Sequence, residues 1–243
     1  MNSFLTAYPK NADGTISQKS TSGFSWAAKD PRVFNWHPVL MTFGLILCSS
    51  QAILIFETKP FAHHTNKLIH IVCHSLSIVS VLVGTIAVFR FHNDQGIPNL
   101  YSLHSWVGIS TLLVFGSQYI IGFLVYFYPG VQLKLRMSWM PYHVGAGVGI
   151  MALVGLTVVS GILEKLTFNG SCNINGVLDG FAVTGLMALD CIVGNTTGLL
   201  VFLWTVSFIV AIWLSKHPLS ESATRNSDHD SASDEEDPLL KNA

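Results

Sequence analysis

The stretch from Leu68 to Phe89 reads LIHIVCHSLSIVSVLVGTIAVF and contains no Asp, Glu, Lys or Arg. A helix that crosses about 30 Å of hydrocarbon needs roughly 20 such residues, and inside a bilayer it must satisfy its own backbone polar groups. Four further stretches have the same character, so we expect five membrane-spanning helices. The expected spans are His37–Phe56, Leu68–Phe89, Leu103–Phe127, Pro141–Ile162 and Thr197–Ser215.

The composition of the whole chain agrees with a membrane protein. Of the 243 residues, 50% are apolar and 11% are charged, whereas soluble domains carry roughly 25% charged residues. A net charge of −1 without a basic block gives no indication of nucleic-acid binding. The 4 cysteines form no C-x-x-C metal or redox pair. The predicted fold class is therefore an all-α membrane protein, a helical bundle.

The chain divides into three parts by composition. Residues 1–32 are polar and lack an apolar core, so we expect neither a signal peptide nor a span before Val33. Residues 33–215 hold all the apolar stretches and form the expected transmembrane domain. Residues 216–243 form an acidic tail.

Positive charges and glycosylation sequons predict the orientation of the helices. Lys and Arg concentrate in the loops 57–67 and 128–140, which the positive-inside rule places in the cytosol. The connection 163–196 instead carries two sequons, at Asn169 and Asn195, and sequons are glycosylated on the lumenal side. We therefore expect this connection in the lumen.

The same connection raises two further expectations. Cys172 and Cys191 lie in it together, and an oxidising lumen would allow them to form a disulfide. The stretch 177–194 is fairly apolar, but Asp179 and Asp190 interrupt it. This favours an interfacial segment over a sixth span.

The C-terminal tail carries a pattern that resembles a sorting signal. Residues 234–240 read DEEDPLL, which resembles the acidic dileucine motif that cytosolic sorting adaptors bind. The resemblance favours a cytosolic C-terminus, adaptor proteins as partners, and a location in the late endosome or lysosome membrane.

Histidines near the start of each of the first four spans indicate the chemistry. Ionisable residues inside a membrane are costly and point to function. Because successive helices run in opposite directions, His37 and His104 can meet at one face, and His70 or His74 can meet His143 at the other. Facing histidines of this kind hold cofactors within helical bundles. A haem with both axial positions filled suits electron transfer rather than oxygen activation, so the pattern predicts two non-covalent b-type haems.

Three other interpretations compete with this one. The histidines can be interfacial side chains, wet at one edge and hydrogen-bonded at the other. The protein can be a histidine-dependent transporter for protons or divalent metal, although such transporters usually carry carboxylates within their spans or helices broken at the midplane. It can also be a haem-less form that acts through association with a partner.

Several motifs resemble those of the cytochrome b561 family of ascorbate-dependent transmembrane ferrireductases. They are FNWHPVLM at 34–41, KLIH at 67–70, YSLHSW at 101–106, and the spacing from Arg136 to His143. The similarity covers roughly 33–215. The dileucine tail and the stretch GILEKL at 161–166 favour the lysosomal branch of the family.

This resemblance implies a four-helix di-haem core plus one further transmembrane helix. The implied axial ligands of the haem irons are His37 with His104 and His70 with His143. Spacing alone cannot choose between His70 and His74, which lie one helical turn apart. The interval found in the family favours His70 and assigns His74 a supporting role at the haem edge.

The chain also departs from the family pattern. The family usually has six helices, and the peripheral helix before the haem core is missing from this chain. Glu57 stands where a basic residue is usual, and His63 stands where a lysine is usual.

The family's substrate residues can be matched one by one. Lys67, Arg136 and Tyr126 match residues that hold ascorbate at the cytosolic face, where fixed cations suit an anion. His92 and Tyr101 match residues near the lumenal acceptor site. The implied function is electron transfer from cytosolic ascorbate to a lumenal acceptor, either ferric iron or monodehydroascorbate. Because the family forms homodimers, we also expect a homodimer.

Overall fold

The computed structural model describes residues 22–172, 177–178, 181–182 and 189–216. Within these residues, 5 helical segments are long and apolar enough to cross a membrane. The all-α prediction with five spans is confirmed. The dileucine pattern at 234–240 lies outside the described residues.

The first span is a single rod built from four helical pieces, and the other spans are more regular. The rod comprises the 3-10 helix η1 (Pro31–Asn35), α1 (Trp36–Met41), the π-helix η2 (Thr42–Cys48) and α2 (Ser49–Thr58). The remaining spans are α3 (His63–Gln95), α4 (Leu103–Gly122) with its π-helical continuation η3 (Phe123–Phe127), α5 (Leu133–Asn169) and α6 (Leu189–Lys216). The short strands β1 (Val177–Leu178) and β2 (Phe181–Ala182) pair antiparallel between α5 and α6.

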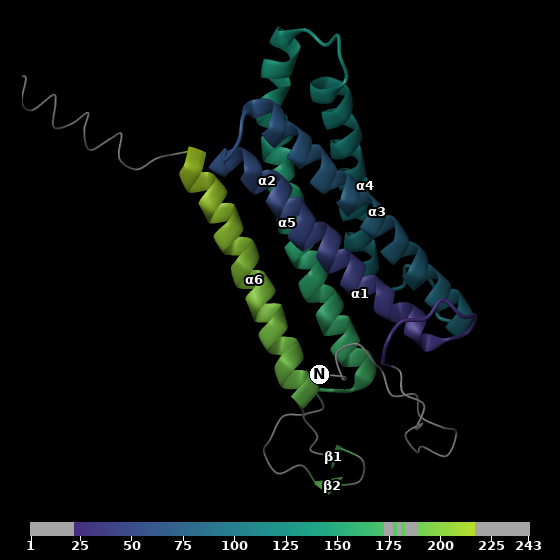
Figure 1. The fold of residues 1–243 in the computed structure, drawn as a ribbon. Coiled ribbons are helices and arrows are strands. Elements are labelled where there is room, and N and C mark those ends of the chain that lie inside the picture. Colours follow the sequence, from purple (N-terminus) through teal and green to yellow (C-terminus); the bar gives the residue numbers. More distant parts are fainter. Residues whose placement is uncertain (1–21, 173–176, 179–180, 183–188, 217–243) are drawn as a thin grey trace, which may run out of the picture.

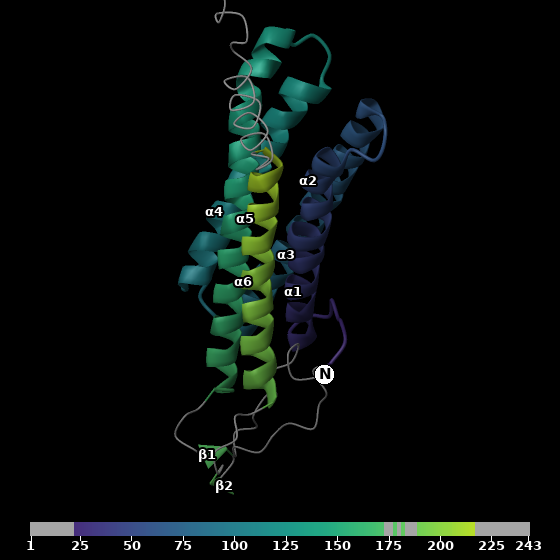
Figure 2. The same ribbon diagram turned by 90° about the vertical axis from the view of Figure 1, so that its left-hand side faces the viewer.

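The helices pack in sequence order into one bundle. The rod of the first span lies along α3, and α5 packs against both α4 and α6. Figures 1 and 2 show α6 beside α5 at the edge of the bundle, with α4 on the other side of α5. The four helices that carry the candidate histidines are therefore neighbours.

Most helices extend beyond the apolar stretches that predicted them. With 37 residues, α5 is about 55 Å long, well above the roughly 30 Å of a hydrocarbon core. The fifth span begins at Leu189 rather than at Thr197, so the last residues of the stretch 177–194 form the first turns of α6. The acidic Asp190 suits the positive end of a helix and accepts a hydrogen bond from the Ser171 hydroxyl at 2.6 Å.

A compact apolar cluster occupies the middle of the bundle. Its fully buried members come from the first span, α3, α4 and α5, and they are Leu45, Val81, Phe115, Ile150 and Val154. A second cluster of Met151, Phe208 and Ile212 joins α5 to α6. Burial of apolar area in lipid gives little driving force, so these contacts contribute mainly by van der Waals packing.

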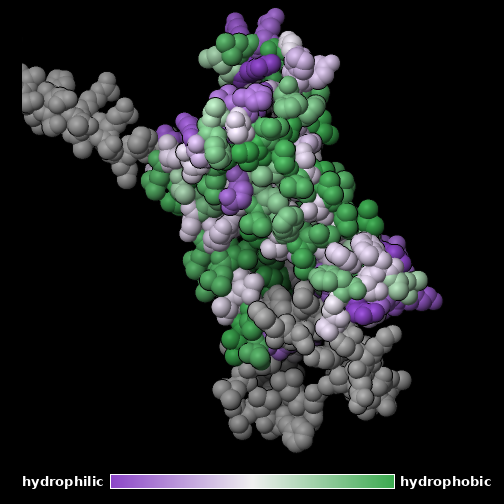
Figure 3. All heavy atoms as spheres, viewed as in Figure 1, coloured by the Kyte–Doolittle hydropathy of each residue, from purple (hydrophilic) through white to green (hydrophobic). Residues whose placement is uncertain are grey.

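The outer surface is apolar around the middle of the bundle. Large side chains such as Leu113, Leu163, Leu200 and Val79 are more than half exposed. Figure 3 shows a broad hydrophobic zone over the helices, with hydrophilic residues gathered toward the two ends. A soluble protein rarely exposes so large an apolar surface, and the chain is a multi-pass membrane protein.

The two ends of the bundle differ in their polar contacts. At one end, called the disulfide end here, Cys172 and Cys191 form a disulfide with their Cα atoms 5.1 Å apart. At the other, called the tail end, the Lys216 ammonium lies 2.6 Å from the Glu57 carboxylate, which also accepts a hydrogen bond from Ser215. This ion pair fixes the last turn of α6 against the end of α2.

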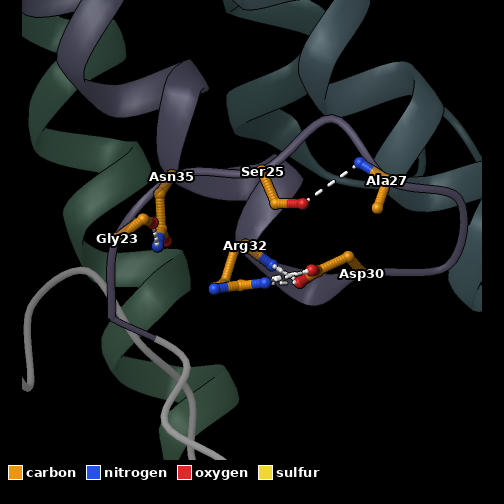
Figure 4. Close-up of polar contacts among 6 residues, drawn as sticks. All are labelled: Gly23, Ser25, Ala27, Asp30, Arg32 and Asn35. Carbon is orange, nitrogen blue, oxygen red and sulfur yellow. Dashed lines mark hydrogen bonds and ion pairs between the residues drawn. The ribbon is translucent and has the colours of Figure 1, made fainter.

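A folded segment precedes the first span at the disulfide end (Figure 4). The Asn35 side chain donates to the Gly23 carbonyl at 2.7 Å, and the Arg32 guanidinium forms an ion pair with Asp30 at 2.7 Å. Hydrogen bonds from Arg32 hold the pKa of the Asp30 carboxyl well below its usual range. These contacts fix the start of the helix that carries His37.

Candidate functional site

His37 and His104 face one another near the disulfide end. Their ring centres are 6.3 Å apart and the ring planes are nearly perpendicular, at 88°. The His37 Nδ1 lies 3.1 Å from the Gly84 carbonyl, and the His104 Nδ1 lies 2.9 Å from the Thr157 carbonyl. Because a carbonyl only accepts, each Nδ1 carries the proton, and each Nε2 keeps a free lone pair.

His70 and His143 form a second pair near the tail end. Their ring centres are also 6.3 Å apart. The His70 Nδ1 bonds to the Ala52 carbonyl at 2.6 Å, which again leaves Nε2 as the free nitrogen. The buried Nδ1 of His143 has no hydrogen-bond partner among the described residues.

His74 is placed differently from these four histidines. Its ring centre lies 4.5 Å from that of His70 and 5.7 Å from that of Phe115. Its Nδ1 is buried without a hydrogen-bond partner in the part of the chain that the structure describes. His74 thus lies beside His70, whereas His143 stands across from His70 at the same spacing as the other pair.

The two pairs lie near opposite ends of the bundle. The Gly84 carbonyl that holds His37 is on α3, the same helix that carries His70. At 1.5 Å per residue, the helix rises about 21 Å from His70 to Gly84. The interval on α5 from His143 to Thr157, whose carbonyl holds His104, gives the same rise.

Both pairs fit a metal-centred planar cofactor held between two imidazoles. Two rings that share one metal have centres about 6 Å apart, because each metal–nitrogen bond is about 2.0 Å long. A backbone acceptor at the second ring nitrogen fixes the tautomer and orientation of metal-binding histidines, and three of the four rings have one. The spacing, the pairing of helices and the free nitrogens therefore suit two haems.

Small residues make room beside two of the rings. A Cβ added at Gly161 would lie 2.7 Å from the Cε1 of His104, and one added at Gly122 would lie 3.0 Å from the Cε1 of His143. Any larger residue would force the ring or its helix to move. Glycine at these positions allows each histidine ring to lie close to the neighbouring helix.

The structure gathers the predicted ascorbate residues at the tail end. Lys67 lies with its ammonium 5.6 Å from the centre of the Phe127 ring, and both line an open cleft of about 230 Å³. Tyr126 donates a hydrogen bond to the Arg136 carbonyl at 3.3 Å, and its ring centre is 5.2 Å from that of His143. The Arg136 side chain is half-buried, and its buried Nε has no hydrogen-bond partner among the described residues.

The predicted acceptor residues lie at the disulfide end. The ring centres of His92 and Tyr101 are 6.2 Å apart, and Tyr101 is 45% exposed. The Tyr101 hydroxyl donates to a carboxylate oxygen of Glu164, and the Ser102 hydroxyl donates to the other at 2.8 Å. Partial burial and the bond to Glu164 raise the pKa of the Tyr101 phenol above its usual range.

Two residues of these sites were not predicted from the sequence. Glu164 has a signal, because it is a charged residue directly after an apolar span, but the sequence does not reveal that it meets Tyr101. His64 lines the tail-end cleft together with Lys67. Its position three residues before Lys67 on a helix is the signal that places both on one face.

Comparison with known proteins identifies the family. The eukaryotic cytochrome b561 family matches residues 36–169. This range includes all four facing histidines. The chain belongs to the cytochrome b561 family, whose name implies haem as the cofactor.

Similar proteins come from plants and animals. A probable ascorbate-specific transmembrane electron transporter of Oryza sativa is 41% identical over 186 residues, covering 76% of this chain and 75% of the relative. A transmembrane ascorbate ferrireductase of Arabidopsis thaliana is 37% identical over 78% of each chain. A lysosomal membrane ascorbate-dependent ferrireductase of Mus musculus is 41% identical over 60% of this chain and 61% of its own. The similarity thus extends over more of the plant proteins and does not single out the lysosomal branch.

Proposed function

We propose that this protein transfers electrons across the membrane from cytosolic ascorbate to a lumenal acceptor, and so acts as an ascorbate-dependent transmembrane oxidoreductase. The observation that carries the proposal is the presence of two facing histidine pairs with equal ring separations of 6.3 Å, one near each end of the bundle. Relatives of similar sequence are named as ascorbate-specific electron transporters and ascorbate ferrireductases.

The proposed cofactors are two b-type haems with His37 and His104 as one ligand pair and His70 and His143 as the other. When bound, they would supply one-electron carriers near each face of the membrane. The chain's part is to orient the ligand rings, and backbone carbonyls on neighbouring helices hold three of the four, those of His37, His70 and His104. The apolar cluster between the pairs excludes water from the interior.

At the tail end, the chain would bind and orient the donor. Lys67 and Arg136 supply positive charge, and the half-buried Arg136 guanidinium would donate a charge-assisted hydrogen bond to the ascorbate anion. Each ascorbate anion gives up one electron and one proton and becomes monodehydroascorbate. The open cleft beside Lys67 gives that proton a path to solvent.

At the disulfide end, His92 and Tyr101 would form the acceptor site. Ferric iron would accept one electron and become ferrous, or monodehydroascorbate would accept one electron and a proton and become ascorbate. The Cys172–Cys191 disulfide supports a lumenal location for this end, because disulfides persist in oxidising compartments.

The membrane location and the assembly state extend the proposal. The dileucine pattern at 234–240 supports late endosomes or lysosomes as the location and sorting adaptors as partners. A homodimer is proposed from the family resemblance.

The experiment is ascorbate-driven ferric reduction by the purified protein in liposomes. External ascorbate should reduce trapped ferric complexes when the tail end faces outward. The variant Arg136→Gln should need a higher ascorbate concentration for half-maximal rate, whereas the matched control Lys134→Gln, two residues away and exposed, should resemble the wild type. Absence of reduction by haem-loaded protein with an accessible tail end would refute the ascorbate assignment.

A further inference from the structure

The carboxylate of Glu164 is held by two hydroxyl groups at the disulfide end. One oxygen accepts from the Tyr101 phenol and the other accepts from Ser102 at 2.8 Å. Both donors precede α4 directly, while Glu164 lies in the last turns of α5. The carboxylate therefore links the end of α5 to the connection between α3 and α4.

This connection leads directly to a candidate haem ligand and to the acceptor site. The Ser102 hydroxyl caps α4 by accepting from the Ser105 backbone N–H at 3.2 Å, and His104 lies in the same first turn. Tyr101 is 45% exposed, so the negative charge of Glu164 is close to solvent. An incoming acceptor would meet it.

The neighbouring positive charges are engaged with other groups. The Arg90 guanidinium pairs with Asp94 at 3.7 Å. The Lys165 ammonium lies 4.5 Å from the centre of the Phe34 ring, on a different face of α5 from its neighbour Glu164. Both cations keep their charge and offset part of the local field, but the Glu164 carboxylate is the charged group that bonds directly to Tyr101.

We propose that Glu164 determines the charge selectivity of the acceptor site, favouring cationic ferric acceptors over the anionic monodehydroascorbate. The inference rests on the proposed function and specifies which class of acceptor this end of the protein takes. Glu164 acts through its charge on the approach of the acceptor. A ferric acceptor gains one electron and becomes ferrous without a proton from the protein.

The expected effect follows from Coulomb attraction. A fixed unit charge acting on a trivalent ion a few ångströms away changes the local ion concentration about tenfold or more, even in water. Trivalent cations and trivalent anions respond in opposite directions. The ratio of their rates should therefore change by about a hundredfold when the charge is removed.

The test measures reoxidation of protein reduced beforehand with dithionite, so it does not depend on ascorbate. Haem-loaded full-length protein in nanodiscs is mixed with hexaammineruthenium(III), a trivalent cation, or with ferricyanide, a trivalent anion, in a stopped-flow instrument. The variant Glu164→Gln keeps the size of the side chain and loses the charge. The matched control is Glu57→Gln, which removes a carboxylate at the tail end.

Glu164→Gln should slow the cationic acceptor and accelerate the anionic one, and added salt should reduce the difference from the wild type. In a redox titration at equilibrium, one of the two midpoint potentials should become more positive, because the nearby negative charge disfavours an added electron. Glu57→Gln should leave the rate ratio within about twofold of the wild type.

An unchanged rate ratio in Glu164→Gln would overturn the inference, as would an equal change in Glu57→Gln. If Glu164→Gln loses haem, the same rates are measured in Glu164→Asp, which keeps the negative charge on a shorter side chain. A ratio of cationic to anionic rates equal to that of the wild type supports the inference, and a ratio shifted toward the anionic acceptor refutes it. Failure of ascorbate to reduce the wild-type protein would refute the proposed function without affecting this measurement.

Discussion

Replacing Gly161 by alanine should remove one of the two proposed haems. The added Cβ would lie 2.7 Å from the Cε1 and 2.9 Å from the Nδ1 of His104, whereas ordinary contacts begin at 3.4 Å. The ring or the α5 backbone must therefore move by about 0.7 Å, and metal–ligand distances tolerate only about 0.2 Å. Overpacking of this kind also costs about 1–3 kcal/mol of stability.

Two other glycine-to-alanine changes should crowd a histidine ring less than Gly161→Ala does, or not at all. At Gly122 the added Cβ would lie 3.0 Å from the His143 ring, so Gly122→Ala requires a smaller displacement and should weaken binding of the other haem only partly. At Gly149, on the same helix as Gly161, an added Cβ meets nothing within 4 Å. Gly149→Ala is therefore the control and should keep both haems.

The assay is the haem-to-protein ratio with the reduced-minus-oxidised visible spectrum of each purified variant. The expected ratios are about two haems per chain for wild type and Gly149→Ala and about one for Gly161→Ala. A full complement of haem with an unchanged spectrum in Gly161→Ala would show that the His104 ring is not held against α5 as described. Equal loss in Gly149→Ala would show that the effect is not local.

Three further predictions concern separate parts of the molecule. His70→Ala should lower the haem content by about one per chain, whereas His74→Ala should retain both haems; the reverse result would make His74 the ligand. Cys172→Ser should lower the free energy of unfolding by about 3 kcal/mol, and reducing agent should lower the melting temperature of the wild type but not of the variant. Asp30→Asn should lower the melting temperature at pH 7. Because the pKa of Asp30 is depressed in the folded protein, the difference in melting temperature between variant and wild type should shrink as the pH falls below about 4. A difference independent of pH would contradict the role of the charge.

The sequence predicted the number and nature of the spans because membrane helices are specified by local composition. A stretch without charges that is long enough to cross the bilayer has few alternatives to a helix. The ends of the helices were predicted less well. The fifth span begins before Asp190, although a charge usually marks the limit of an apolar stretch, because the Ser171 hydroxyl and the start of the helix accommodate that carboxylate.

The candidate ligands also followed from the sequence, because alternating helix direction alone brings His37 toward His104 and His143 toward His70 or His74. Helical spacing could not separate His70 from His74, which share one face. Only the packed bundle shows that His143 stands 6.3 Å across from His70 while His74 lies at its side. That distinction depends on the rotation of each helix about its axis, which neighbouring helices determine.

The amino-acid sequence by itself thus determined the membrane class, the number of spans and the set of histidines, since each depends on residues close together in the chain. The tertiary structure decided which groups meet across the bundle. The carbonyls that orient the rings come from Gly84, Thr157 and Ala52. Because every residue has a backbone carbonyl, the residue type does not reveal which carbonyl bonds to a ring. The contact of Glu164 with Tyr101 likewise joins residues 63 apart in sequence, which only the packing of α5 beside α4 brings together.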